Sequence, residues 1–201
     1  MRNYGGWFSP NGKYIYFMEY GGGSPTESYI RALERASGKL IDITTGLYVY
    51  YSSSNIEASS GSGRVFFYAE TNSAANDENL YYFDQDTASP AVKLTSFTST
   101  NYIYDIAPSD DGSLVAFGAG SGSTSQQMYV VEVSSTPVVR QLTTTAGYVM
   151  DMKMFTSDNK AVVYGTGSSS YKPDVRVQLV TGGPAKVLET ENYNSVMMVW
   201  K

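Results

Sequence analysis

The 201-residue chain contains neither cysteine nor histidine. The absence of cysteine excludes disulfide bonds, thiolate zinc sites and covalent haem attachment, and it leaves the redox compartment open. The absence of histidine removes the usual general base, the Ser-His-Asp triad and imidazole metal ligands. Chemistry would therefore depend on carboxylates, lysines, tyrosines and hydroxyl groups, and we expect no cofactor, no metal site and no enzymatic activity.

Charge and long apolar runs are also scarce. Fourteen Lys and Arg against 19 Asp and Glu give a net charge of −5, and the basic residues are scattered. This distribution argues against a nucleic-acid binder, which normally carries a basic face. No stretch reaches eighteen apolar residues, so we expect no membrane span, and residues 1–6 lack the pattern of a signal peptide. With 42% hydrophobic residues the chain can nevertheless build a core.

A turn-and-strand pattern occurs four times along the chain. Residues 8–17 read FSPNGKYIYF, a polar turn followed by an apolar and aromatic run, and this predicts a hairpin entering a strand. The pattern returns at 60–68, 109–117 and 156–164. Aligned on Gly12, Gly63, Gly112 and Asn159, the copies are 51, 49 and 47 residues apart, and an aromatic residue follows five positions later at Phe17, Tyr68, Phe117 and Tyr164. Asn is the next most tolerant residue of positive φ, so its use in the fourth turn is physically sensible.

Each copy heads a unit of four predicted strands. The segment 29–35 could pass for a short helix, but its counterparts in the other units favour a strand. The predicted strands lie near 5–8, 13–20, 28–34 and 39–43; 48–58, 64–70, 79–84 and 91–95; 102–108, 113–119, 127–133 and 139–143; and 148–155, 160–166, 174–180 and 185–188. Four-stranded units with a period near fifty residues predict an all-β fold, a β-propeller of antiparallel blades.

The repeated motif resembles that of TolB-like (PD40, WD40-like) β-propeller repeats, "W-S-P-D-G-K-x-I-A-F". The family's later strands resemble 80–84 with 93–95 in the second unit and 128–132 with 141–143 in the third, whereas 41–44 and 186–189 are looser matches. No copy has the full Ser-Pro-Asp-Gly, and the place of the motif's tryptophan is aligned with Phe8, Ser59, Pro108 and Phe155. The resemblance implies a propeller. Because the family includes periplasmic scaffolds, gating domains of serine peptidases and some lyases, it does not fix the function. It also favours a periplasmic, cell-surface or extracellular location.

We expect a single array over 1–201, with units at about 1–47, 48–99, 100–146 and 147–190. One further strand is left over, formed by Ser195, Val196, Met197, Met198, Val199 and Trp200. Three arrangements would accommodate it: a fragment of a longer propeller, half of an eight-bladed ring closed by a dimer, or a small propeller whose last strand closes the ring or adds to a neighbour.

Two kinds of apparent motif have a simpler explanation. The acidic stretches 84–86 and 110–112 do not continue into the ligand spacing of a calcium loop, and Asp is common in tight turns. The glycine-rich stretches 21–24, 118–122 and 165–170 lack the following lysine and helix of a phosphate-binding loop. We therefore interpret both kinds as turns and connections between strands.

Tyrosine is abundant, with 18 copies, and several stand at strand starts or loop ends. In a propeller, the loops between second and third strands share one face with the connections between blades. Tyrosine with Ser, Thr, Asn and Gly is typical of adaptable protein- and sugar-binding surfaces, although each tyrosine could instead pack between blades. The candidate binding residues on this face are Tyr48, Asp77, Glu78, Tyr102, Tyr148, Tyr171, Asp174 and Tyr193.

Three functions fit these observations. The first is a non-catalytic binding or scaffold module that takes a protein partner or its own copies, with a glycan as a further candidate ligand. The second is the propeller portion of a larger enzyme, such as a gated serine peptidase. The third is a structural subunit of a filament or surface array, in which the strand at 195–200 completes a neighbouring sheet.

Overall fold

The computed structural model describes residues 2–20, 28–49, 56–71, 77–85, 90–98, 102–122, 125–144, 148–167 and 174–189. These residues form β-strands, turns and irregular segments, without a helix among them. In the part of the chain so described, no helix is therefore long and apolar enough to cross a membrane. The leftover strand at 195–200, with Tyr171 and Tyr193, lies outside the described residues.

Sixteen strands form four antiparallel sheets of four strands each, in which each strand pairs with its neighbour in the chain. Blade 1 contains β1 (Arg2–Phe8), β2 (Tyr14–Tyr20), β3 (Ser28–Glu34) and β4 (Leu40–Asp42). Blade 2 contains β5 (Ile56–Ala58), β6 (Arg64–Ala69), β7 (Asn79–Asp84) and β8 (Val92–Lys93). Blade 3 contains β9 (Tyr102–Pro108), β10 (Leu114–Gly120), β11 (Gln126–Glu132) and β12 (Val138–Gln141). Blade 4 contains β13 (Tyr148–Phe155), β14 (Ala161–Gly167), β15 (Asp174–Leu179) and β16 (Lys186–Glu189).

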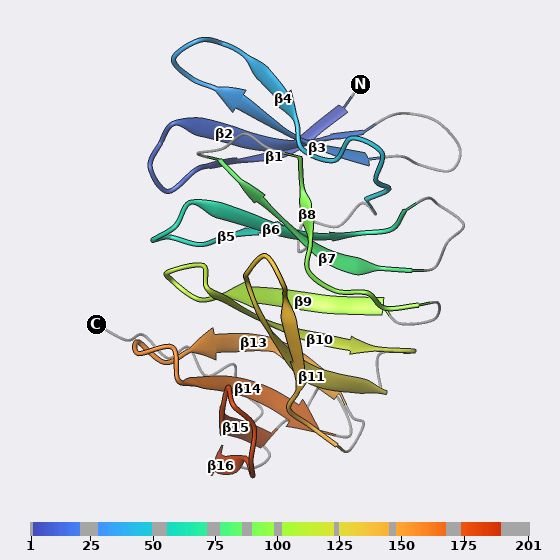
Figure 1. Cartoon of the computed structure of the whole chain (residues 1–201), viewed down its shortest axis with the longest axis vertical. Helices are drawn as coiled ribbons and strands as arrows, with labels where there is room; N and C mark the ends of the chain where they lie inside the picture. The colour runs from blue at the N-terminus through green and yellow to red at the C-terminus, as the bar shows by residue number, and fades with distance from the viewer. Residues whose placement is uncertain are drawn as a thin grey trace.

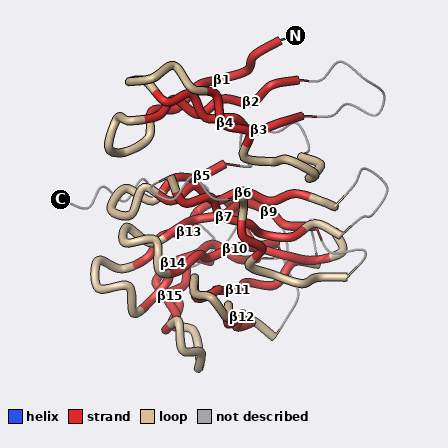
Figure 2. Tube along the Cα trace, turned by 45° about the horizontal axis from the view of Figure 1, so that its top comes forward, coloured by secondary structure: helices blue, strands red, loops and turns tan. Residues whose placement is uncertain are grey.

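The four blades form a stack, from blade 1 at the top to blade 4 at the bottom of Figure 1. In the tilted view of Figure 2, blade 1 remains at the top, and the sheets of blades 3 and 4 overlap in projection. The strand ladders of each sheet stay within one blade. The blades are joined mainly by side chains, with a backbone bond from the N–H of Gly61 to the carbonyl of Asp110 between blades 2 and 3. The all-β class and the four-stranded antiparallel blades predicted from the sequence are confirmed, including the strand predicted at 28–34.

A hydroxyl group fastens the hairpin that opens most of the blades. In blade 1 the N–H of Ser9 donates to the carbonyl of Tyr14 at 2.9 Å, and the N–H of Tyr14 donates to Oγ of Ser9 at 2.9 Å. Ser109 and Thr156 make the same pair of bonds in blades 3 and 4. The predicted left-handed residues are confirmed, with φ of 68° at Gly12, 68° at Gly63, 66° at Gly112 and 57° at Asn159.

The second hairpin corrects the sequence alignment by one residue. The N–H of Gly63 bonds to the carbonyl four residues earlier, at Ser59, whereas the other three turns bond three residues back. The loop of the second hairpin has the same length as the other three, but its left-handed residue stands one position later than in those loops. The matching strand pairs are Phe8–Ile15, Ala58–Val65, Pro108–Val115 and Phe155–Val162.

This register gives repeat spacings of 50, 50 and 47 residues between the matching strand positions. The aromatic residue that matches Phe17 in blade 2 is therefore Phe67, and the expectation of Tyr68 was wrong. Likewise Ala58, and not Ser59, stands in the place of the motif's tryptophan. Phe67 stacks on its cross-strand partner Tyr81, with ring centroids 5.7 Å apart, and the matching pair in blade 3, Phe117 and Tyr129, stacks at 5.4 Å.

The Leu-Thr pairs at the end of the fourth strands have a structural reason. After β8 ends, the hydroxyl of Thr95 accepts the buried N–H of Leu80 at 2.9 Å. Thr44 does the same for Ile30 at 3.1 Å, and Thr143 for Met128 at 2.9 Å. Each threonine thus replaces a strand partner where the outer strand leaves the sheet, which keeps a backbone donor satisfied.

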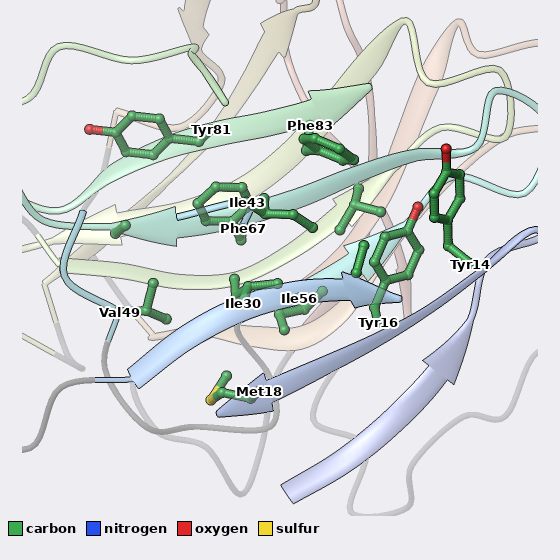
Figure 3. Packing of buried hydrophobic residues seen from close by; sticks show 13 residues of the cluster. Tyr14, Tyr16, Met18, Ile30, Ile43, Val49, Ile56, Phe67, Tyr81 and Phe83 are labelled. Atoms are coloured by element: carbon green, nitrogen blue, oxygen red, sulfur yellow. The ribbon is translucent and has the colours of Figure 1, made fainter. Parts of the chain in front are cut away.

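Alternate residues of each second strand face the two neighbouring blades, as the period of a strand requires. Between blades 1 and 2, one row from β2 meets the opposite row of β6 in a cluster that Figure 3 shows. The following junctions have clusters of their own. The β2 and β6 members of the first cluster are Tyr14, Tyr16, Met18, Val65, Phe67 and Ala69.

Candidate functional site

The tyrosines predicted at strand starts lie at one end of the blades. Tyr48 is bridged to Glu70, Tyr102 is opposite Gly120, and the backbone of Tyr148 is opposite Gly167. Each thus stands beside the end of a second strand, where the chain turns toward the third strand. We call this the loop end; it is at the right of Figure 1, and the hairpins that open the blades form the turn end at the left.

Two carboxylates face each other at the loop end of blade 2. Because Ala69 pairs with Asn79, the next residues along the two strands, Glu70 and Glu78, are opposite each other. Glu70 is fully buried and Glu78 is only 5% exposed. The structure therefore places two acidic side chains together in an environment of low solvent access.

Glu78 also ties blade 2 to blade 3. Its Oε2 accepts the backbone N–H of Ile103, in β9, at 2.6 Å. Burial raises the pKa of Glu78 to about 7; the bond from Ile103 opposes that rise and the nearby charge of Glu70 adds to it. At neutral pH this carboxyl group is thus close to the midpoint of its titration.

Two tyrosines of β9 complete this junction. Burial raises the pKa of the Tyr104 phenol, and the negative potential of Glu78 and Tyr102 adds to the rise. Tyr102 itself is 38% exposed, so it presents a large amphipathic side chain to solvent. The loop end of the blade 2–blade 3 junction therefore combines an acidic interior with an aromatic surface.

Asp77 closes the stem of the preceding loop. Its two oxygens accept the N–H and the hydroxyl of Thr71, both at 3.0 Å. Asp77 also raises the pKa of Tyr81, after the larger effect of burial. Of the predicted site residues, the structure thus brings Glu78 and Tyr102 to this junction, whereas Asp77 acts on Tyr81, which packs in the cluster between blades 1 and 2.

The remaining described candidates have different surroundings. Tyr48 is buried, so it supports the loop end from inside. Asp174 lies at the loop end of blade 4, where one carboxylate oxygen accepts a bond from Arg176 at 2.9 Å.

The turn end holds a cavity that the sequence did not suggest. Its volume is about 360 Å³, and it lies where β5, β9 and β13 end. Glu57 and Asp105 line it, and burial followed by the charge of Asp105 raises the pKa of Glu57. Asp105 has φ of 47° at a bulge in β9. A charged residue inside the apolar run 103–107 was the only sequence signal for this cavity.

The described residues contain no group of three or more acidic side chains placed to hold a metal ion. Glu70 and Glu78 supply two carboxylates, whereas calcium takes six to eight oxygen ligands. The described residues of the loop end can therefore exchange a proton at Glu78, form hydrogen bonds and make aromatic contacts.

The four-stranded antiparallel blades form a β-propeller array, and solved TolB structures share this fold, which supports the resemblance of the sequence motif to TolB-like repeats. No protein-family model and no curated protein matches the sequence. Solved structures do match: TolB from Acinetobacter baumannii superposes with a TM-score of 0.57 and 17% identity over 94% of this chain and 44% of its own. A putative TolB from Agrobacterium tumefaciens gives 0.56 and 16% over 92% of this chain and 65% of its own.

Peptidase structures contain the same architecture. Prolyl oligopeptidase B from Galerina marginata, bound to a 35-residue hydrolysis and macrocyclization substrate, superposes with a TM-score of 0.63 and 13% identity. The match covers 93% of this chain and 28% of that enzyme. This chain thus spans less than two thirds of each of these proteins, and at such identities the likeness concerns the fold.

Proposed function

We propose that this chain is a non-catalytic binding module that takes a protein partner through its loop end. The observation that carries the proposal is the blade 2–blade 3 junction, where the exposed Tyr102 directly precedes Ile103, whose N–H bonds to the buried Glu78. Tyr102 offers contact area at low cost in conformational entropy, as aromatic residues do in adaptable binding surfaces. The absence of histidine and cysteine from the chain is consistent with binding in place of catalysis.

The role as a scaffold, and a place in the periplasm, on the cell surface or outside the cell, belong to the same proposal. Both come from the motif's resemblance to TolB-like repeats and from the TolB structures that share the fold. A glycan ligand is the alternative for the same surface, because tyrosine faces also bind sugars.

The test compares matched surface variants in capture experiments. Thr98→Arg adds a long charged side chain at the loop end, and Ser157→Arg adds the same group at the turn end; both positions are exposed. We expect wild type and Ser157→Arg to retain the same protein from the source organism, and Thr98→Arg and Tyr102→Ala to lose it. Retention by all four proteins would overturn the proposal. A glycan array probed with the same set would show whether a sugar takes the protein's place.

A second function, as the propeller part of a larger peptidase, is favoured by the likeness to prolyl oligopeptidase B. Its test is the full coding sequence around this chain. A hydrolase domain in the same reading frame would establish this second function, and its absence there would rule it out.

A further inference from the structure

The cavity at the turn end is built by three successive blades. Its lining comes from the first strands of blades 2, 3 and 4 and from the hairpins that follow β9 and β13. Asp110, in the first of these hairpins, is fixed by blade 2, because its backbone carbonyl accepts the hydroxyl of Ser59 and the N–H of Gly61, each at 2.6 Å. The volume of about 360 Å³ falls in the range of small-molecule sites. The protein thus forms a preorganised cavity of suitable size at this end.

The charged residues of the cavity are all acidic. Glu57, Asp105 and Asp110 line it, and none of the described lining residues is Lys or Arg. Glu57 takes part in no ion pair within the described part of the chain, whereas Glu132 and Asp174 pair with arginines. Solvent reaches Glu57, but the surrounding protein removes part of its hydration, and this loss, followed by the charge of Asp105, raises its pKa. A cation in the cavity would compensate this negative charge.

The repeat itself requires neither of the two strand carboxylates. Asp105 is the extra residue of a bulge in β9 and has φ of 47°, and the bulge of β1 has Gly5 in the matching place. A glycine adopts the left-handed conformation at lower cost. Trp7 is the match of Glu57 in blade 1, and it packs into the cluster with blade 2. Because bulges often turn a side chain toward a functional site, we interpret the two acidic residues as groups that serve the cavity.

The chemistry of the lining favours an organic cation over a metal ion. Among the described residues, no three acidic side chains are placed to hold one metal ion. A guanidinium or amidinium group can instead reach separate carboxylates through its several N–H donors, in charge-assisted hydrogen bonds. Ile106, Met154 and Phe155 add apolar surface to the lining, and the ring of Phe155 can also contact a cation through its face.

We propose that the turn-end cavity binds an organic cation, a guanidinium, amidinium or ammonium group on a small apolar body. Glu57 and Asp105 accept hydrogen bonds from the cationic group, and Met154 and Phe155 contact the apolar body. A free small molecule and the arginine or lysine side chain of a peptide both present this chemistry, and the experiment separates these two sources. Because the cavity is at the opposite end of the blades from the loop end, the proposal does not depend on the proposed function.

The test titrates the intact chain with two matched pairs of probes in a calorimeter. Benzamidine is compared with benzamide, which has the same shape without the charge, and acetyl-arginine amide with acetyl-citrulline amide. We expect each cation to bind at least about tenfold more tightly than its neutral match, and its affinity to fall as salt is added. Tighter binding of acetyl-arginine amide than of benzamidine would assign the site to a peptide side chain, and the reverse order to a free small molecule; both results support the proposal.

Variants locate the binding. Glu57→Gln and Asp105→Asn each remove one charge from the cavity, and Asn tolerates the left-handed backbone, so each should weaken benzamidine binding about tenfold or more. Glu132→Gln removes the same charge from a residue that pairs with Arg140, and it should leave the affinity unchanged.

Arginine substitutions at the two ends of the blades give a second comparison. Ser157→Arg places a cationic side chain in the lining and should abolish binding, whereas Thr98→Arg at the loop end should not. Circular dichroism of each variant checks that the fold is retained. Equal affinities for each cation and its neutral match, or no binding of any probe, would overturn the proposal. Folded Glu57→Gln and Asp105→Asn variants that bind benzamidine as wild type does would overturn it equally.

Discussion

The side-chain amide of Gln85 fills the space that a Cβ atom on Gly63 would occupy. Gln85 is buried, and it receives two hydrogen bonds from blade 1: the hydroxyl of Tyr14 donates to its backbone carbonyl at 3.2 Å, and that of Tyr16 to its Oε1 at 3.1 Å. Gly63 itself has φ of 68°. The lack of a side chain at Gly63 therefore allows the left-handed turn of the second hairpin and also leaves room for Gln85 at the junction between blades 1 and 2.

We expect Gly63→Ala to destabilise the protein by about 3 kcal/mol, from about 1 kcal/mol of left-handed strain and the displacement of a buried, hydrogen-bonded amide. For a chain of this size that corresponds to a fall in Tm of roughly 6–12 °C. The matched control is Gly38→Ala, because Gly38 has φ of 71° but open space around its Cβ position. Thermal unfolding of both variants measures the difference; equal losses would contradict the role of Gln85.

Glu78→Gln should remove a pH dependence of stability. The pKa of Glu78 is raised to about 7 in the folded protein from 4.5, so its stabilising contribution is fully present below pH 4.5 and is lost as the pH rises to about 7. The loss amounts to at most about 3 kcal/mol. Glutamine keeps an oxygen for the N–H of Ile103 and carries no charge. Urea unfolding between pH 4.5 and 8 should thus show a flatter profile and greater stability at pH 8 for the variant.

Glu132→Gln is the control for this measurement, because it removes a negative charge from a partly exposed side chain that pairs with Arg140. Its pH profile should follow that of wild type. If the Glu78→Gln variant kept the wild-type dependence of the unfolding free energy on pH, another group would be the cause of that dependence.

Thr95→Val should cost about 1–3 kcal/mol, because it leaves the buried N–H of Leu80 without its acceptor in a volume-matched side chain. Thr98→Val, three residues further on and exposed, should change stability by less than about 0.5 kcal/mol. Chemical unfolding at one pH compares the two. If both substitutions were neutral, the explanation given for the Leu-Thr pairs would fail.

The repeated turn was enough to predict sixteen strands and their grouping in fours, because turn chemistry and strand propensity act over a few residues. In β3, β7, β9 and β13 the predicted bounds match the structure. The register of the second hairpin could not be predicted, because Gly63 occurs in a loop of unchanged length and only the hydrogen bond to Ser59 shows its shift.

The site was predicted in part. Asp77, Glu78 and Tyr102 could be assigned to one end of the blades from topology alone. The pairing of Glu78 with Glu70 depends on the register of β6 and β7. The bond from Ile103 to Glu78 depends on how blade 2 packs on blade 3, which no local pattern encodes. The cavity beside Glu57 and Asp105 depends on the ends of three separate strands in the same way.

The central claim is that the loop end binds a protein partner. The most direct measurement is the Kd of the captured partner for wild type, Tyr102→Ala and Ser157→Arg by surface binding at fixed salt. We predict that Tyr102→Ala weakens binding about tenfold or more, as loss of an aromatic anchor does, and that Ser157→Arg leaves the Kd unchanged. An unchanged Kd for Tyr102→Ala, or a weakened one for Ser157→Arg, would contradict the account.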